Sequence, residues 1–316
     1  MVVRAIRSAA AQFSGRALGH RLGRGDPGWH PGSGRDTLRV AGTVIVIQVE
    51  RLGSALGVEV PGLNLALPLD EEQQVDLRRH LAEHLVLVFR DQSLTPPMQI
   101  AFTRVFGPVE PHPLSTHRDP AHPELLVLQN RPGEPGRRND IWHTDMTFAE
   151  CPPAASVLHA LEVPENRGDT LFCNMIATYD DLSETMRARL SAMRAVHSAE
   201  PEVRARAGAA QDETVAAQSP VAVCHPVVRR HPETGQACLF INPYYTKRFT
   251  DMTVAESRPL IHFLTKYATR PENVYRHRWR VGDVVIWDNR ATMHYAVHDY
   301  DETMPRLLHR TTAAGP

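Results

Sequence analysis

Three stretches of the chain place apolar residues at helical spacing or carry helix-boundary signals. Residues 70–84 (DEEQQVDLRRHLAEH) form an amphipathic pattern with an acidic first turn, which the positive end of a helix dipole favours. Thr95 followed by Pro96 is a typical helix start, and Gly107 ends the unit TPPMQIAFTRVFG. A third helix is predicted over residues 253–267.

Short apolar runs between these stretches predict strands. They are LVLVFRD (85–91), LLVLQN (125–130), SVLHALEV (156–163), CLFIN (238–242) and DVVIWD (283–288). Many short strands separated by turns are typical of a β-sandwich or a barrel. The pattern therefore predicts an α+β protein dominated by its sheets.

Composition narrows the classes of function. The 316 residues are 42% hydrophobic, which is enough for one large core, and the formal net charge is −1. Such a charge gives no reason to expect binding to nucleic acid or to an anionic membrane surface. The four cysteines form no CxxC pair, and no apolar run approaches the roughly 20 residues of a membrane span. We expect a protein of the reducing cytoplasm.

The first 45 residues differ from the rest. They contain seven arginines and eight glycines but only two acidic residues, Asp26 and Asp36. This composition is too poor in apolar residues to pack, so we expect residues 1–45 to be a disordered basic extension and residues 46–316 to form one domain. An organellar transit peptide is the alternative interpretation of this segment.

Two motifs carry candidate metal chemistry. WHTDMTF contains His143 and Asp145 two residues apart, and WDNRATMHYAVHDY contains His294 about 150 residues later. Bulky and β-branched neighbours predict a strand around the first pair, in which side chains at i and i+2 share one face. Two imidazoles and a carboxylate bind non-haem Fe(II) and leave positions open for oxygen. His298 and His309 compete for the third position, and a surface histidine beside a solvated aspartate is the alternative for a lone His-x-Asp.

Because these and three further motifs occur in the same order along the chain as in that family, the chain resembles the TauD/TfdA family of Fe(II)- and 2-oxoglutarate-dependent dioxygenases. The likeness runs from about residue 46 to residue 314 through WHTDMTF, GDT, HPVVRRHPETG, RWRVGDVVIWDNRATMHYAVHDY and RLLHRTT. It implies a double-stranded β-helix, which is a jelly roll with flanking helices. It also implies that His143, Asp145 and His294 are the metal ligands and the catalytic centre.

The resemblance further assigns a co-substrate pocket. Thr170 and Arg306 match the residues that hold the distal carboxylate of 2-oxoglutarate, and Trp279 is assigned to the lining of that pocket, with a core tryptophan as the alternative interpretation. An arginine suits this role because its planar fork makes two parallel charge-assisted bonds to a carboxylate. Arg306 and Arg310 lie in RLLHRTT, whose leucines and threonines predict a strand in which both arginines point the same way.

Four residues match the substrate-contacting positions of the family: His112, Asn139, Tyr245 and Arg310. The match is incomplete elsewhere. Ser115 stands where the taurine-binding members have a tyrosine, and residues 200–218 contain no counterpart of a family phenylalanine. We therefore expect an intact iron and co-substrate site beside an altered substrate pocket, with more room and less apolar wall than a taurine site.

The reaction implied is hydroxylation of a small organic anion by a ferryl-oxo species, with 2-oxoglutarate and O₂ consumed and succinate and CO₂ released. A sulfonate of the taurine type is the first candidate substrate, and a carboxylate or an alkyl sulfate ester is the alternative. We expect a homo-oligomer. A zinc hydrolase with the same three ligands and a non-catalytic jelly-roll binding protein are the competing classes.

Overall fold

The structure is a computed structural model that describes residues 47–115, 117–132, 139–200 and 222–315. All of these residues belong to one compact unit, Val44–Pro316. The expectation of a disordered extension over residues 1–45 lies outside the described residues, as does most of the stretch 200–218. No helix in the described part of the chain is long and apolar enough to cross a membrane.

The first predicted helix is confirmed as α1, Glu71–His84. Its start is fixed locally, because the Asp70 side chain accepts the Gln73 N–H and the Gln73 side chain accepts the Asp70 N–H. Leu85 then takes a left-handed conformation with φ of 65° and ends the helix. The chain continues at once into the predicted strand, β3 (Val86–Phe89).

The other two predicted helices are also present. The second is α2, Pro96–Thr103, which tightens into the 3₁₀ turn η1, Arg104–Phe106. Thr95 has the backbone conformation of an N-cap, but its side chain makes no capping hydrogen bond. The third is α7, Val254–Ala268, whose start carries a full capping box between Thr253 and Glu256. The shorter helices α3 and α4 were not predicted; they span Met175–Asp180 and Glu184–Ser191.

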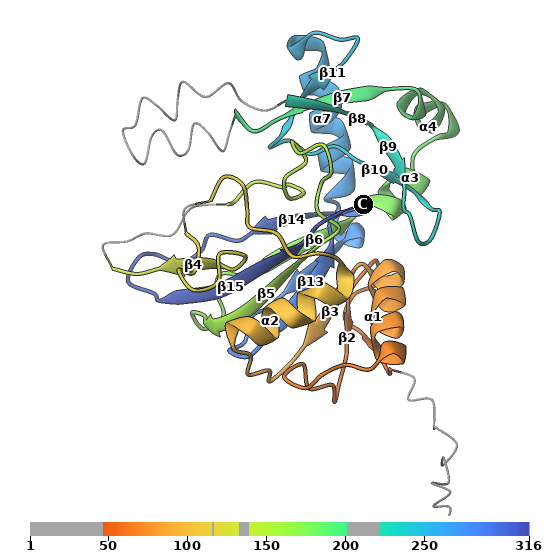
Figure 1. The fold of residues 1–316 in the computed structure, drawn as a ribbon. Helices are drawn as coiled ribbons and strands as arrows, with labels where there is room; N and C mark the ends of the chain where they lie inside the picture. The colour runs from red at the N-terminus through yellow and green to blue at the C-terminus, as the bar shows by residue number, and fades with distance from the viewer. Residues whose placement is uncertain (1–46, 116, 133–138, 201–221, 316) are drawn as a thin grey trace, which may run out of the picture. The chain divides into compact units, whose positions relative to one another are not determined.

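Most of the predicted strands meet in one sheet. Among the described residues this main sheet has seven strands in the order β1-β2-β3-β13-β5-β15-β4 (Figure 1). Besides β3, its strands are β1 Glu50–Arg51, β2 Val58–Glu59, β4 Leu126–Asn130, β5 Ala155–Glu162, β13 Val284–Asp288 and β15 Arg306–Ala313. Neighbours are antiparallel except β2 and β3, which are parallel.

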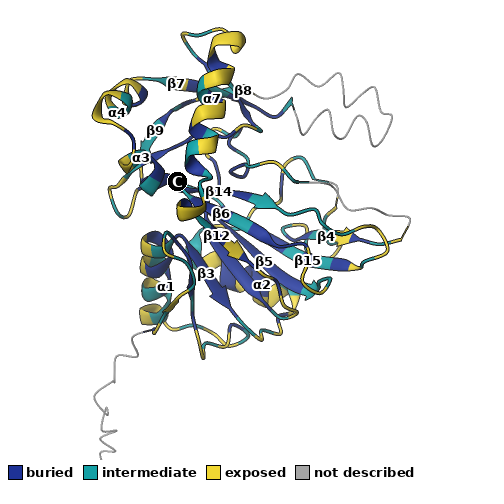
Figure 2. Cartoon of the chain, turned by 180° about the vertical axis from the view of Figure 1, so that it is seen from behind, coloured by how far each residue is buried: buried dark blue, intermediate teal, exposed yellow. Residues whose placement is uncertain are grey.

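Both faces of the main sheet are covered at its centre, so the central strands β3 and β13 are buried in every position rather than at alternate ones. Leu87 and Phe89 face α1 and α2 in one core cluster, while Val86 and Val88 face the opposite cluster. The central strand β13 divides in the same way and is buried along its whole length, as is its neighbour β3 (Figure 2). Strands buried on both faces are expected to read as continuous apolar runs, which DVVIWD does.

A second, three-stranded sheet packs on the inner face of the main one. Its order is β12-β6-β14, with bounds Val274–His277, Thr170–Asn174 and Thr292–Ala296. Phe172 and Met293 from this sheet share a core cluster with Val285 and Leu308 from the main sheet. Two facing sheets with helices outside them are the predicted α+β jelly roll (Figure 1).

The remaining elements form a layer around α7 (Figure 1). They are a sheet of β11, β7 and β8 (Thr246–Phe249, Arg194–Ser198, Ala222–Pro226), a pair β10 and β9 (Ala237–Leu239, Val228–Arg230), and the 3₁₀ turn η2, Pro271–Asn273. The predicted strand CLFIN is therefore only partly confirmed, because β10 ends at Leu239.

Candidate metal centre and adjoining pockets

His143, Asp145 and His294 converge in the structure. One potential ligand atom from each lies within 4.8 Å of the other two. The Nε2 atoms of His143 and His294 are each 3.8 Å from Oδ1 of Asp145, and the two imidazole centroids are 4.1 Å apart. All three side chains are buried. The two sequence motifs thus supply one compact cluster of two imidazoles and a carboxylate.

The predicted strand around the His-x-Asp pair is wrong. His143 makes only an isolated antiparallel bridge, and residues 145–148 form turns. Met146 follows Asp145 with φ of 45°, which no strand residue adopts. The partner across the bridge is His294 itself, with N to O distances of 3.0 and 2.7 Å between the two backbones. Convergence therefore depends on a distant pairing with β14 and not on the shared face of a strand.

Neighbouring groups fix the orientation of the His143 ring. Its Nδ1 lies 2.7 Å from the carbonyl oxygen of Ile141, which can only accept a hydrogen bond. That contact assigns the ring proton to Nδ1 and leaves a lone pair on Nε2. The Asn139 side-chain amide lies 2.9 Å from the same Nε2 and donates to it. Asn139, a predicted substrate residue, is thus in contact with the predicted ligand atom of His143.

Asp145 divides its two oxygens between different partners. Oδ1 faces the imidazoles, while Oδ2 accepts from the Ser156 hydroxyl at 2.7 Å and from Arg310 at 2.8 Å. Burial raises the pKa of Asp145, but the positive charge of Arg310 and the hydrogen bond from Ser156 lower it by more, so the net pKa lies below its usual value and the carboxylate is ionised at all ordinary pH values. Ser156 was not predicted; it lies on β5 and carried no sequence signal of its own.

His294 is held in an apolar setting. Its ring centroid is 4.8 Å from that of Trp287 and 6.2 Å from that of Phe172. Burial lowers the pKa of His294 well below its usual value, and the neighbouring His143 and Arg310 lower it further, against the opposite effect of Asp145. The imidazole is therefore neutral and available as a ligand.

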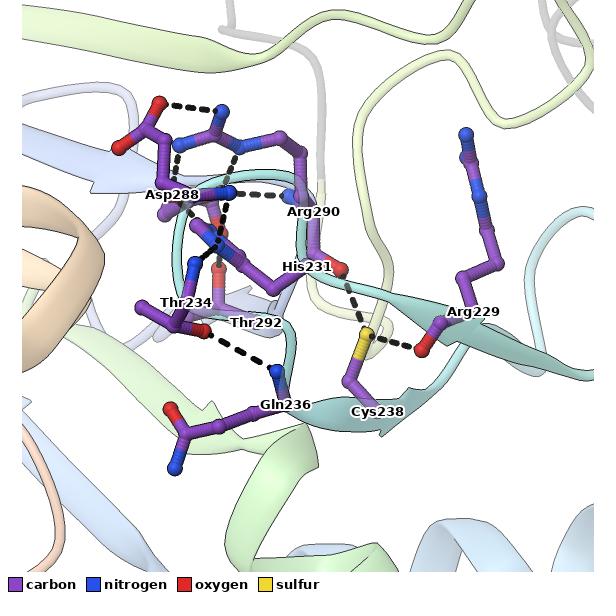
Figure 3. A network of polar contacts seen from close by, with 9 residues as sticks. Arg229, His231, Thr234, Gln236, Cys238, Asp288, Arg290 and Thr292 are labelled. Carbon is purple, nitrogen blue, oxygen red and sulfur yellow. Dashed lines mark hydrogen bonds and ion pairs between the residues drawn. The ribbon is translucent and has the colours of Figure 1, made fainter. Parts of the chain in front are cut away.

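A buried polar network positions the turn that leads into β14 (Figure 3). The Asp288 carboxylate bonds to Arg290 at 2.5 Å and to His231 at 3.0 Å, and its backbone oxygen accepts from the Thr292 hydroxyl at 2.6 Å. The Thr144 hydroxyl in turn donates to the Thr292 carbonyl at 2.7 Å. The network thereby connects the β13–β14 turn to the segment between His143 and Asp145.

The three predicted co-substrate residues come from neighbouring segments: Thr170 begins β6, Arg306 begins β15, and Trp279 lies just after β12. The Trp279 indole donates to the Thr170 hydroxyl at 3.0 Å, and Arg306 on β15 reaches the Gly168 carbonyl, two residues before Thr170, at 3.4 Å. The Arg306 guanidinium also lies over the ring of Tyr300, 5.6 Å from its centroid. Arg306 is buried, its Nε has no hydrogen-bond partner, and burial lowers its pKa.

Gly168→Ala is expected to weaken 2-oxoglutarate binding. Gly168 has φ of +68°, and an added Cβ would lie 3.1 Å from Nε of Arg306 and 3.2 Å from Tyr300. The left-handed backbone conformation alone destabilises an alanine at this position by about 1–2 kcal/mol. Gly62→Ala is the matched control, because Gly62 has φ of +75° and nothing within 4 Å. Both variants should lose similar stability in thermal melts, and only Gly168→Ala should lose affinity in calorimetry. Equal 2-oxoglutarate affinities in the two variants would show that Gly168 does not border the co-substrate pocket.

A small apolar cluster that the sequence analysis did not anticipate contains one predicted substrate residue, Tyr245, and lies beside another, His112. We call this cluster the apolar wall; its buried members are Phe148, Ala199 and Tyr245, and its partly buried members are Leu114, Met146 and Tyr244. Tyr245 is buried against Phe148, whereas the ring of Tyr244 lies 5.9 Å from that of His143. His112 is also buried, and its Nδ1 accepts the N–H of Leu114 at 3.2 Å.

The competing histidines lie elsewhere. Across the described residues, the groups of three side chains able to hold a metal ion do not include His298 or His309. His298 is in the loop after β14 and packs against Tyr300, while His309 is within β15. The two arginines of β15 do share a face as predicted, since Arg306 and Arg310 are buried at alternate positions with Leu308 between them.

The fold and the site define the class of this protein: a jelly roll with the two-histidine, one-carboxylate side-chain set of oxygen-activating non-haem enzymes. Residues 48–312 match the family described as "Taurine catabolism dioxygenase TauD, TfdA family". The chain belongs to the TauD/TfdA family.

Relatives with known activities support this placement. An alpha-ketoglutarate-dependent sulfate ester dioxygenase of Pseudomonas putida is 36% identical over 88% of this chain and 93% of its own. An alpha-ketoglutarate-dependent 2,4-dichlorophenoxyacetate dioxygenase of Cupriavidus pinatubonensis is 36% identical over 82% and 93%. The crystal structure of AAD-2 in complex with Mn(II) and N-oxalylglycine has a TM-score of 0.77 and 30% identity, covering 86% of this chain and 99% of its own.

Proposed function

We propose that this protein is an Fe(II)- and 2-oxoglutarate-dependent dioxygenase that hydroxylates an organic anion carrying an apolar body. The observation that carries the proposal is the arrangement around Asp145, whose Oδ1 faces two imidazoles while its Oδ2 is bonded to the buried Arg310. This arrangement supports a metal ion beside Oδ1 and a substrate anion beside Arg310, on opposite sides of one carboxylate. When bound, iron and 2-oxoglutarate supply O₂ activation, with succinate and CO₂ as products.

The donor set fits ferrous iron. Two imidazole nitrogens and one carboxylate are the ligands that hold non-haem Fe(II) and leave positions open. His143 presents an unprotonated Nε2, His294 stays neutral, and Asp145 is ionised. Each ligand is therefore in its metal-binding protonation state without any proton having to leave.

Arg306 is suited to the far carboxylate of 2-oxoglutarate. Among the described residues, no carboxylate lies within ion-pair distance of this buried guanidinium. A buried charge without a counter-charge is costly, and an arriving carboxylate reduces that cost by pairing with it. Thr170 and Trp279, joined by a hydrogen bond, form the adjoining wall of this pocket.

Arg310 and the apolar wall indicate the form of the substrate. The Nε of Arg310 is buried without a hydrogen-bond partner, so this side chain retains a donor for an anion. Because Arg310 touches Asp145, an anion bound to it holds the adjacent carbon beside the metal. Tyr244 and its neighbours then favour an alkyl or aryl body over the ammonium of taurine.

A sulfonate of this form is our first candidate substrate. Sulfate esters and aryloxy carboxylates belong to the same chemical class, and the two relatives named above act on such compounds. The test is substrate-dependent succinate formation over a panel of hexanesulfonate, hexyl sulfate, phenoxyacetate, taurine and hexanol. We expect turnover with the anions that carry an apolar body and little with taurine or hexanol. Preference for taurine would contradict the role of the apolar wall, and equal turnover of hexanol would contradict the anion site.

Arg310→Ala is expected to raise the KM for the anionic substrate by about 10- to 100-fold, the range set by about 1.5–3 kcal/mol for a hydrogen bond to a charged group. The affinity for 2-oxoglutarate should stay close to that of the unchanged protein, because Arg306 and not Arg310 faces that pocket. Steady-state kinetics and calorimetry measure the two effects. A loss of 2-oxoglutarate affinity with an unchanged KM would reverse the two arginine assignments.

A further inference from the structure

The C-terminal end of α1 carries a second group of potential metal ligands, remote in sequence from the centre described above. His80 and His84 are one helical turn apart on α1, with Glu83 between them. One ligand atom from each of the three lies within 4.8 Å of the other two. The two imidazoles are stacked, with centroids 5.7 Å apart and an interplanar angle of 16°.

His80 supplies an independent indication of a ligand. Its side chain is only 5% exposed, and its Nδ1 is buried without any hydrogen-bond partner. Its Nε2 lies 3.1 Å from two groups: the carbonyl oxygen of Ile47, which can only accept, and a guanidinium nitrogen of Arg79, which can only donate. In the tautomer that donates from Nε2 to Ile47, Nδ1 carries a buried lone pair. That tautomer, with one nitrogen donating to a backbone carbonyl and a lone pair on the other, is the usual arrangement of a metal ligand.

We propose that His80, Glu83 and His84 form a second metal site, for a divalent cation of the Zn²⁺, Ni²⁺ and Cu²⁺ class. Two imidazoles and one carboxylate suit these borderline ions, and histidines at i and i+4 of a helix can share one ion. The location also favours a cation, because the last turn of a helix presents the negative end of its dipole.

The ligand atoms must approach one another when the ion binds, and the side chains allow it. The side chains of Glu83 and His84 are 46% and 19% exposed, so they can change rotamer without disturbing the core. Glu83 now pairs with Arg79 at 3.2 Å, but Arg79 also pairs with Asp76 at 2.8 Å and keeps that partner if Glu83 turns to the ion. Exposed ion pairs of this kind are weak.

The site would stabilise the contact between α1 and the segment of the chain that contains Ile47. The carbonyl of Ile47 contacts His80, and its N–H donates to Asp76 at 3.0 Å, one turn earlier on α1. A metal that immobilises the His80 ring would stabilise this attachment of the chain to α1. This role is separate from the proposed reaction, because α1 packs on the face of the main sheet that Leu87 and Phe89 form, whereas His294 packs against Trp287 of the opposite face.

The test is the number of Ni²⁺ ions bound per chain, measured by equilibrium dialysis of the full chain at low micromolar free Ni²⁺. We expect two for the unchanged protein, one for His84→Asn, one for His294→Ala and none for the double variant. His262→Ala, which removes an exposed histidine of α7, is the matched control and should leave two.

The thermal midpoint gives a second measurement. Ni²⁺ should raise the midpoint of His294→Ala by a measurable shift, and the shift should vanish when Glu83→Gln and His84→Asn are added. One ion per chain in the unchanged protein, with no effect of His84→Asn, would overturn the second site. Failure of the iron assignment would show instead as two ions retained by His294→Ala, so the two outcomes are distinguishable.

Discussion

Asp145→Asn is expected to lower the affinity for Fe(II) by more than about 100-fold, since loss of an outer partner of a metal ligand alone costs 10–100-fold. The substitution keeps the shape of the side chain but removes the charge that both imidazoles and Arg310 face. Substrate-dependent succinate formation should fall below detection. Iron content after anaerobic loading, and succinate after mixing with substrate, measure the two losses.

His298→Ala is the control for this prediction. His298 lies in the loop after β14, outside the cluster of ligand atoms, and should retain iron. Circular dichroism of both variants establishes that each is folded. If Asp145→Asn kept stoichiometric iron while His298→Ala lost it, the assignment of the metal centre would be wrong.

Arg306→Lys is expected to weaken the binding of 2-oxoglutarate by about 10- to 100-fold, because the parallel hydrogen bonds of the guanidinium are lost although the charge remains. Arg306 is buried, and a lysine would place a strongly hydrated ammonium in the same confined space. Iron binding should be unaffected, because the contacts of Arg306 described above are to Gly168 and Tyr300 and not to the three proposed metal ligands. Calorimetric titration of the iron-loaded protein with 2-oxoglutarate gives the affinity.

Arg131→Lys supplies the matched change on the surface, where the side chain pairs with Glu162 at the end of β5. Its affinity for 2-oxoglutarate should equal that of the unchanged protein. An unchanged affinity in Arg306→Lys as well would remove Arg306 from the co-substrate pocket.

The helices could be predicted because their limits are set by neighbours in sequence. Asp70 with Gln73, and Thr253 with Glu256, exchange hydrogen bonds within a single turn, so the residues that define each start are adjacent in the chain. The strand predicted around His143 failed for the opposite reason. Its only bridge partner is His294, and the positive φ of Met146 has no local sequence signature.

The candidate site divides in the same way. His143, Asp145 and His294 could be found from their motifs because ligand chemistry restricts the residue types. Ser156 could not, because a serine within an apolar strand has no distinctive pattern and its role follows from meeting Asp145 across the core. Tyr244 was missed for a similar reason: only the packing of the apolar wall turns it, rather than Tyr245, toward His143.

The reciprocal hydrogen bonds between the backbones of His143 and His294 bear on how the centre acquires its ion. Zinc fingers fold around their metal, so binding must offset the entropy of ordering the chain. Here two backbone hydrogen bonds join the main chains of the histidines without using a ligand atom, so we expect loading to require mainly side-chain rotation. The protein is therefore a rigid chelator: amide hydrogen exchange at both histidines should be slow with or without iron, and a metal-depleted pool should reload quickly rather than refold.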